Sequence, residues 1–407
     1  MSDSVQDFRP AAHETFVKLS AAFAANGNYW QLGHTFDTII DYLTIAPADA
    51  VGFAKIALDR YNVSNTNGTA CWYDDFSWWG IAALKASQRP NLFGDDTAKF
   101  SSIAQSCWAS TDGKAPFVWA NADQQAYAEL RPRIGADTQD VNGGVWNYYW
   151  GPFTGGCSPD DPRGDECPPT MHGCLCGYQN TVTNGLYLVL ASRLAQANPQ
   201  VPHYRQASDR EFMFFYNWFD LSDPDPLTTP LLNRYTVGKA VVRERVSTYA
   251  PKGANPPYPP VQCYNPSVVW TGDQGLILGG MVDRMQLVGP ASPLYPYMRN
   301  VAQSIAAGVL DSLATNALLQ PWTPNQPSPC GDDGDYLTGP AVYMRYLLYA
   351  FLTNADIRNS LRVMNYPVFV QINAANVVKH PSSDGDMVGL TNDLATLVTA
   401  IMMPAAE

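Results

Sequence analysis

Two adjacent carboxylates, Asp74 and Asp75, lie in the most aromatic stretch of the chain, CWYDDFSWWG at 71–80. Neighbouring residues on a regular helix project about 100° apart, so both acids can face one ligand only from a helix start. The helical pattern begins just after them, at Phe76. Helix dipoles favour the anionic form of one carboxylate, and that anion together with the aromatic wall raises the proton affinity of the other. We therefore expect one ionised and one protonated acid.

This pair of protonation states is what retaining glycoside hydrolysis requires. One carboxylate attacks the anomeric carbon while a nearby acid protonates the departing oxygen, with about 5 to 5.5 Å between the two groups. The aromatic rings alongside could stack on the apolar faces of sugar rings. Taken as a bare dipeptide, however, Asp74 and Asp75 are more typical of an N-cap and a first-turn acid. The choice between these interpretations depends on the rest of the chain.

The composition indicates a globular protein with a neutral ligand. Of 407 residues, 46% are hydrophobic and only 15% are charged, with 11 Trp, 22 Tyr and 16 Phe, which allows a large core and an aromatic-lined cavity. The formal charge of −12 argues against nucleic acid or an anionic membrane surface as a partner. No run of eighteen apolar residues occurs, so we expect no membrane span. We also expect a monomer without a cofactor or a bound metal.

The cysteines favour an extracellular or periplasmic protein with disulfide bonds. Eight are present, and four of them, Cys157, Cys167, Cys174 and Cys176, fall in one Pro- and Gly-rich stretch. With His172 these four could instead bind zinc, but their spacing matches no common zinc pattern. The first residues show no signal peptide, so either the protein stays in the cytoplasm or a signal peptide was removed.

Apolar residues repeat mostly at three- and four-residue spacing, which predicts an all-α protein. About twelve helices are expected, and twelve helices without a sheet favour a toroid of paired helices or a solenoid. Long irregular connections are expected at 138–179 and 220–267. Nothing resembling a linker divides the chain, so we predict one domain over 1–407. The expected helices lie at 10–25, 33–44, 47–61, 76–88, 95–110, 120–131, 180–197, 203–219, 270–287, 294–315, 339–354 and 388–402.

Five stretches, in this order along the chain, resemble the motifs of glycoside hydrolase family 76, the endo-α-1,6-mannanases. CWYDDFSWWGIAAL resembles the aromatic setting of that family's catalytic aspartate pair, and each of the other stretches resembles the opening of a family helix. The others are NYWQLGHTFDTIIDYL (28–43), GGVWN (143–147) with QNTVTNGLYLVLASRLA (179–195), VVWTGDQGLILGGMVD (268–283) and DYLTGPAVYMRYLLYAF (335–351).

The resemblance implies an (α/α)6 barrel, which agrees with the helix count. It also implies that Asp74 is the nucleophile and Asp75 the general acid/base, because the first and second acids of the family pair have those roles. Further residues of the matching motifs would then bind substrate at the central cleft. They are Tyr29, Trp30, Trp72, Tyr73, Trp146, Asn180, Asn184, Asp273 and Gln274.

The chain also departs from the family pattern. A Cys-rich insertion at about 151–177 is longer than the corresponding family loop and enters beside the GGVWN motif. Asp273 and Thr338 stand where the family usually has Asn and Lys, so the sugar need not be mannose. The resemblance leaves open the sugar, the linkage and whether cleavage is internal or terminal.

Other enzyme classes fit the residues less well. A sugar isomerase or epimerase on a helical barrel would use a histidine pair, and no such pair is apparent; His34 is expected to pack near Asp37. A terpene cyclase would need further acids after the pair. The acidic stretch CGDDGDYL (330–337) could provide cleft carboxylates or form a turn that leads into the helix at Gly339, and the turn is the favoured interpretation.

The function predicted from the sequence is therefore retaining hydrolysis of an α-linked polysaccharide or oligosaccharide, with α-1,6-mannan or a related α-polysaccharide as the first candidate. The alternatives are a non-catalytic carbohydrate-binding barrel and a sugar isomerase or epimerase. Replacement of either acid should separate hydrolysis from the other two.

Overall fold

The computed structural model describes residues 7–66, 73–112, 144–145, 180–219, 231–244, 269–324 and 334–404. The predicted all-α fold is confirmed, since helices make up most of this part of the chain. Within it, no helix combines the length and the apolar character needed to cross a bilayer. The expected helix at 120–131 and the Cys-rich insertion at 151–177 lie outside the described residues, as do Trp72 and Trp146.

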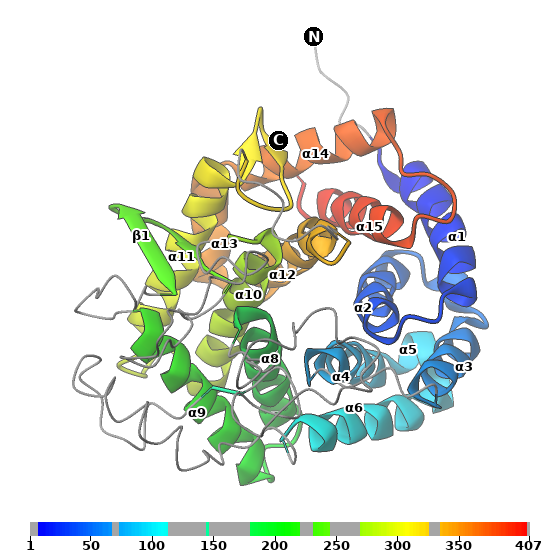
Figure 1. Cartoon of the computed structure of the whole chain (residues 1–407), viewed down its shortest axis with the longest axis horizontal. Coiled ribbons are helices and arrows are strands. Elements are labelled where there is room, and N and C mark those ends of the chain that lie inside the picture. Colours follow the sequence, from blue (N-terminus) through cyan, green and yellow to red (C-terminus); the bar gives the residue numbers. More distant parts are fainter. Residues whose placement is uncertain are drawn as a thin grey trace, which may run out of the picture.

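Six of the described helices form an inner ring in which each helix packs against the next (Figure 1). The ring closes where the last of these helices packs against the first. In order they are α2 (Tyr29–Ile45), α4 (Tyr73–Ser87), α8 (Thr181–Ala197), α10 (Thr271–Val288), α12 (Gly339–Thr353) and α15 (Met387–Met402).

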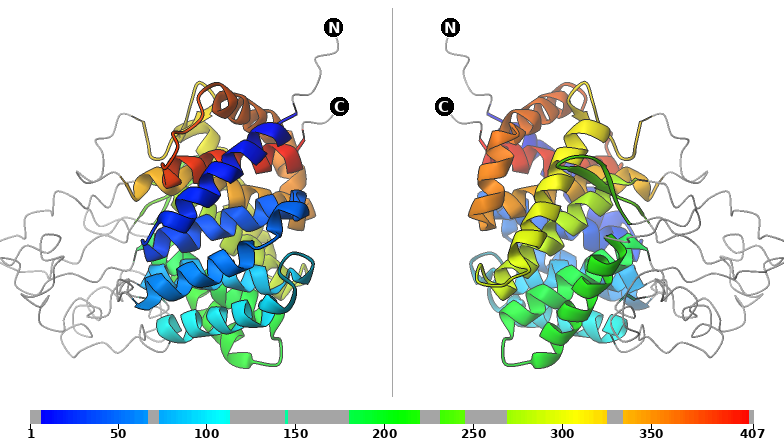
Figure 2. Two further views of the ribbon diagram at one scale, coloured as in Figure 1. Left: turned by 90° about the vertical axis from the view of Figure 1, so that its right-hand side faces the viewer. Right: turned by 90° about the vertical axis from the view of Figure 1, so that its left-hand side faces the viewer.

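The outer layer alternates with the inner ring along the sequence, which is the arrangement of an (α/α)6 barrel. Figure 2 shows the N-terminal helix α1 beside the C-terminal helix α15, so both ends of the helical sequence belong to one ring. The outer helices are α1 (Arg9–Ala25), α3 (Phe53–Thr66), α6 (Thr97–Asp112), α9 (Pro202–Phe219), α11 (Tyr295–Ser312) and α14 (Tyr366–Lys379).

Shorter elements connect these layers. The hairpins β1 (Leu232–Thr236)/β2 (Lys239–Val242) and β3 (Ala314–Thr315)/β4 (Leu318–Leu319) are antiparallel. The remaining elements are the helix α13 (Ala355–Val363), the short helix α5 (Pro90–Phe93) and the 3-10 turns η1 (Pro47–Ala50), η2 (Gly94–Asp96) and η4 (Tyr336–Thr338).

Several boundaries differ from the sequence prediction for local reasons. The helix α2 begins four residues early because the Asn28 side chain accepts a hydrogen bond from the Gln31 N–H at 3.3 Å and caps it. The helix predicted at 47–61 is divided, because Gly52 has a φ of +81° and separates η1 from α3. The helices α13 and α14 were not predicted, and the hairpin β1/β2 lies within a connection that was expected to be irregular.

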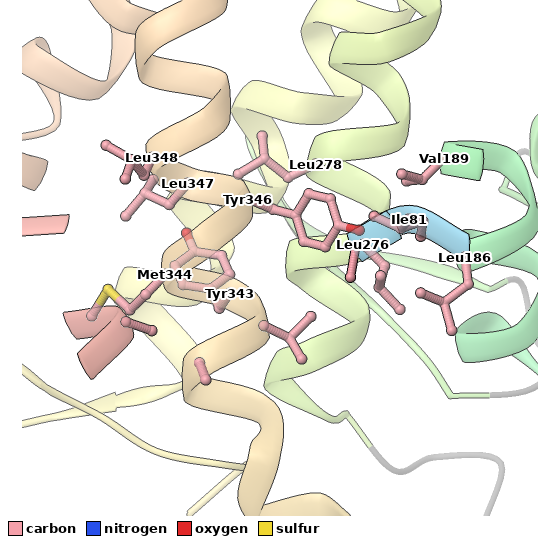
Figure 3. Packing of buried hydrophobic residues seen from close by; sticks show 14 of the residues in the cluster. Ile81, Leu186, Val189, Leu276, Leu278, Tyr343, Met344, Tyr346, Leu347 and Leu348 are labelled. Atoms are coloured by element: carbon pink, nitrogen blue, oxygen red, sulfur yellow. The ribbon is translucent and has the colours of Figure 1, made fainter. Parts of the chain in front are cut away.

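Apolar side chains of the inner helices fill much of the middle of the ring. In Figure 3 the ring of Tyr346 extends from α12 toward Ile81 of α4, with Leu276 and Leu186 nearby. All four side chains are almost completely buried. Burial of this apolar surface on every inner helix is what holds the ring together.

The inner helices all begin at the same end of the barrel. Two contacts between neighbouring helices show this near their N-termini: Trp79 Nε1 donates to the Tyr29 carbonyl at 2.7 Å, and the hydroxyls of Thr35 and Thr391 lie 3.0 Å apart. At the opposite end, Arg193 of α8 pairs with Asp283 of α10 at 2.9 Å. We call these the N-terminal end and the C-terminal end of the ring. The sequence motifs that resemble family 76 begin at the N-terminal end.

Candidate functional site

Asp74 and Asp75 lie in the first turn of α4, at the N-terminal end of the ring. The helix begins at Tyr73, three residues earlier than predicted, so the acids belong to its first turn rather than preceding it. The Asp75 N–H donates to Asp74 Oδ1 at 3.2 Å. Asp74 is partly exposed, whereas Asp75 is 7% exposed. The acids therefore lie at a helix start, as predicted, but the expectation that they precede the helix and face one cavity is wrong, because neighbouring residues of a regular turn project to different faces.

The two carboxylates lie on different faces of α4. Residues four apart share a helix face, so Asp74 lies one turn above Trp78, and Asp75 lies one turn above Trp79. Trp78 is directed toward the ring axis, where its indole lies within 6.0 Å of the guanidinium of Arg345 on α12. Trp79 is directed toward α2 and packs on Tyr29. Asp74 therefore stands on the axial face, and Asp75 stands on the face toward α2.

The proton affinity of Asp74 is unusually high for a carboxylate. Burial raises its pKa to about 7, and the negative charge of Asp335 adds to this effect, although backbone N–H groups of Asp74 and Asp75 oppose it. A carboxyl group with such a pKa changes its protonation state near neutral pH. Proton-transfer chemistry at neutral pH requires this property.

Asp335 contributes to the raised pKa of Asp74. From the sequence, this residue is interpreted as part of a turn. The turn is confirmed: the Asp335 carbonyl accepts hydrogen bonds from Thr338 N at 3.2 Å and Thr338 Oγ1 at 2.6 Å, directly before α12. Trp270 Nε1 donates to the Tyr336 carbonyl at 2.8 Å, which anchors this segment to the start of α10. The proximity of Asp335 to Asp74 depends on packing across the ring, and no spacing in the sequence indicates it.

Three of the predicted aromatic residues lie near the acids. Tyr73 and Tyr29 are each 2% exposed and belong to the core, and the Tyr29 ring packs against Phe76 with centroids 5.8 Å apart. Trp30 is only partly buried, and its ring centroid lies 6.3 Å from that of His34. Substrate binding by Trp30, Tyr29 and Tyr73 stays a prediction.

The two residues of α8 that were predicted to bind substrate are buried, and their side chains bind backbone atoms. Asn180 caps the helix by accepting from Thr183 N at 3.2 Å. The Asn184 amide accepts from Val145 N at 2.6 Å and donates to the carbonyls of Val145 at 3.0 Å and Asn180 at 2.7 Å. A Cβ on Gly144 would lie 2.5 Å from the Phe214 ring, so only glycine fits beside this clamp.

Gln274 of α10 makes the same kind of clamp. Its amide accepts from Val242 N at 2.8 Å and donates to the carbonyls of Val242 at 2.8 Å and Trp270 at 2.9 Å. Asp273, its neighbour, is fully buried in the first turn of α10. Substrate binding by Asn184, Asp273 and Gln274 stays a prediction, and in this structure the two amides bind main chain.

The thiol of Cys107 is free and buried, while the other seven cysteines fall outside the described residues. A groove of about 640 Å³ lies on the outer wall between β1/β2, α11 and α13, away from α4. Its lining includes Arg234, Asn300, Gln303 and Asn359. This groove is separate from the aspartate pair, which lies on the inner ring.

Sequence comparisons give no relative: no family model matches the chain, and no curated protein matches it. Solved structures do match. An inactive variant of an α-1,6-mannanase from a Salegentibacter species, with two consecutive aspartates replaced by asparagine and α-1,6-mannotriose bound, has a TM-score of 0.55 at 16% identity. The match covers 96% of this chain and 97% of that chain.

Two further matches are similar in extent. The Dfg5 protein of Chaetomium thermophilum, in complex with glucosamine, has a TM-score of 0.57 at 13% identity, over 92% of this chain and 81% of that one. A family 76 α-mannanase of Bacteroides thetaiotaomicron has a TM-score of 0.52 at 10% identity, over 98% and 96%. The resemblance to family 76 is thus confirmed at the level of the fold: the chain has the helical barrel that these mannanases share.

Proposed function

We propose that the protein is a retaining glycoside hydrolase that cleaves an α-linked glycan, with α-1,6-mannan or a related α-polysaccharide as the first candidate substrate. Asp74 acts as the nucleophile and Asp75 as the general acid/base. The observation that carries this proposal is the position of both acids in the first turn of an inner helix of the barrel.

The fold neighbours support the same assignment. The Salegentibacter mannanase is inactive when two consecutive aspartates become asparagine, and that variant was solved with α-1,6-mannotriose. This chain has one barrel of the same kind with a consecutive aspartate pair at an inner-helix start. Two carboxyl groups are sufficient for the reaction, because one forms the glycosyl-enzyme bond and the other transfers the proton.

The raised pKa of Asp74 makes the assignment of roles testable. A nucleophile must be ionised, so kcat/KM should rise with pH through about 7 as Asp74 loses its proton. If Asp74 were instead the proton donor, kcat/KM would fall over the same interval. A profile that falls through neutral pH would therefore exchange the roles of Asp74 and Asp75 while leaving the reaction class intact.

The first experiment measures release of reducing ends from α-1,6-mannan, other α-mannans and α-glucans, with NMR of the first product anomer. Asp74→Asn and Asp75→Asn should each lower kcat at least about 1,000-fold, or about 4 kcal/mol of transition-state stabilisation. Asp95→Asn, at an exposed acid of η2, is the matched control and should keep the parent rate. Parent-like hydrolysis by both site variants would refute the proposal, and glycan binding without new reducing ends would favour the non-catalytic alternative.

A further inference from the structure

Arg345 places a charged group in the middle of the ring, where it connects three inner helices. It belongs to α12 and is 4% exposed. Its Nη1 donates to Thr38 Oγ1 at 2.9 Å and lies 3.2 Å from the His34 carbonyl oxygen, both on α2. Its Nε lies 3.1 Å from Asp37 Oδ2, and its guanidinium carbon lies 6.0 Å from the centre of the Trp78 ring on α4.

The guanidinium of Arg345 sets both the tautomer and the charge of the His34 ring. Arg345 Nη1 lies 3.0 Å from His34 Nδ1. A guanidinium can only donate, so Nδ1 must be the acceptor and the proton of the neutral ring must be on Nε2. Burial and the charge of Arg345 lower the pKa of His34 well below its usual range, although the charge of Asp37 opposes them. His34 is therefore an uncharged ring with one fixed tautomer.

His34 is part of an aromatic layer that includes Trp78, the residue one helical turn from Asp74 on α4. Its ring meets Trp78 edge-on with centroids 5.3 Å apart, and Trp30 lies on its other side. Trp78 lies one helical turn below Asp74 on the same face of α4. All the groups of this layer, Trp30, His34 and Trp78, are uncharged, so the layer offers Asp74 no positive charge.

We propose that Arg345 is a positioning residue of the Asp74/Asp75 site, which locks the His34 ring as a neutral hydrogen-bond acceptor and so keeps an uncharged aromatic floor beneath Asp74. The inference rests on the proposed function for its importance in catalysis, but the contacts that carry it are independent of that function. Without Arg345, the carboxylate of Asp37 would attract a proton to His34. The resulting imidazolium would then favour the ionised form of Asp74.

Within the part of the chain that the structure describes, the charged groups that act on His34 and Asp74 are the following. His34 faces Arg345 from α12 and Asp37 from its own helix, and the element that packs on it from α4 contributes the uncharged Trp78. Asp37 is held in turn by Lys85 at 2.8 Å. Asp74 has its neighbour Asp75 and the charge of Asp335. A change in the charge of His34 should therefore be visible in the titration of Asp74.

The experiment titrates the intact protein by NMR, with ¹⁵N-labelled histidine and ¹³C-labelled aspartate carboxyls. In the parent, His34 should show the Nε2-protonated tautomer and stay neutral well below the pH range in which an unperturbed histidine takes up a proton. In Arg345→Gln, His34 should take up a proton near neutral pH, and the midpoint for Asp74 should fall by about one pH unit. Arg345→Lys keeps the positive charge and should leave both titrations close to those of the parent.

A double variant distinguishes this role from a merely structural one. In His34→Phe/Arg345→Gln no imidazolium can form, so the Asp74 midpoint should return toward the parent value. An unchanged Asp74 midpoint in Arg345→Gln, or an Nδ1-protonated His34 in the parent, would overturn the proposal. The parent spectrum decides the second outcome even if Arg345→Gln does not fold. Neither measurement uses substrate. The proposed hydrolase function can therefore fail while the role of Arg345 stands, and the role of Arg345 can fail while the hydrolase function stands.

Discussion

Two carboxylates on the inner ring, Asp37 and Asp74, differ in their charged surroundings. Asp37 lies at the middle of α2, where burial would raise its pKa, but Lys85 and Arg345 outweigh that effect and hold the pKa well below its usual range. Asp74 lies at the N-terminal end of the ring, where burial prevails and raises its pKa to about 7. The same side chain is thus a permanent anion beside two cations and a titrating acid where burial prevails.

The comparison shows that a cation beside a buried carboxylate does not always fix its charge. Lys85 pairs with Asp37 and Asp41, and Arg193 pairs with Asp283. The pKa of Asp37 is lowered, whereas burial outweighs the paired cation and raises the pKa of Asp41 and of Asp283. Asp74 has a labile proton near pH 7, which suits catalysis but costs stability.

Replacement of Asp37 by Asn should produce the largest effect. The change leaves Arg345 buried without its counter-charge, while Lys85 keeps Asp41, so the free energy of unfolding should fall by about 3 to 5 kcal/mol. Urea denaturation at pH 7 measures it. Asp384→Asn, which removes only an exposed pair with Lys18, is the control and should cost less than about 1 kcal/mol. Equal losses for the two variants would contradict the idea that the buried charges around Asp37 hold the inner helices together.

Replacement of Asn184 by Leu should have an intermediate effect. It would leave the N–H and carbonyl of Val145 without the clamp that holds them, at a cost of about 2 kcal/mol. Thermal unfolding of this variant is compared with that of Asn359→Ala, an exposed amide on α13, which should stay within about 0.5 kcal/mol of the parent. A parent-like Tm for Asn184→Leu would show that the clamp contributes nothing.

Replacement of Asp74 by Asn should have the smallest effect on stability and the opposite sign. The folded-state pKa of about 7 is above the unfolded value, so the folded protein keeps a proton that the unfolded chain releases. Stability in the parent should therefore decline as pH rises from about 4 to 7. Asp74→Asn removes this penalty and should gain about 1 to 2 kcal/mol at pH 7 and nothing at pH 4, as measured by urea denaturation. A lower free energy of unfolding for Asp74→Asn than for the parent at pH 7 would contradict the difference drawn between Asp74 and Asp37.

Much of the ring could be predicted from local patterns, because each inner helix presents apolar residues at helical spacing and the acids stand directly at a helix start. The helix α14 was missed because its sequence YPVFVQINAANVVK combines β-branched residues with an early proline. The contact between Arg345 and His34 joins residues 311 positions apart, and only ring closure brings them together. The influence of Asp335 on Asp74 has the same origin.

The amide clamps at the N-terminal end have a consequence for how such a barrel can diversify. Asn184 binds main-chain atoms of Val145 and Asn180, and Gln274 binds those of Val242 and Trp270. These hydrogen bonds fix the path of the chain but do not depend on the side chains of Val145 and Val242. Segments of different composition can therefore occupy these two positions while the helices that hold them stay unchanged.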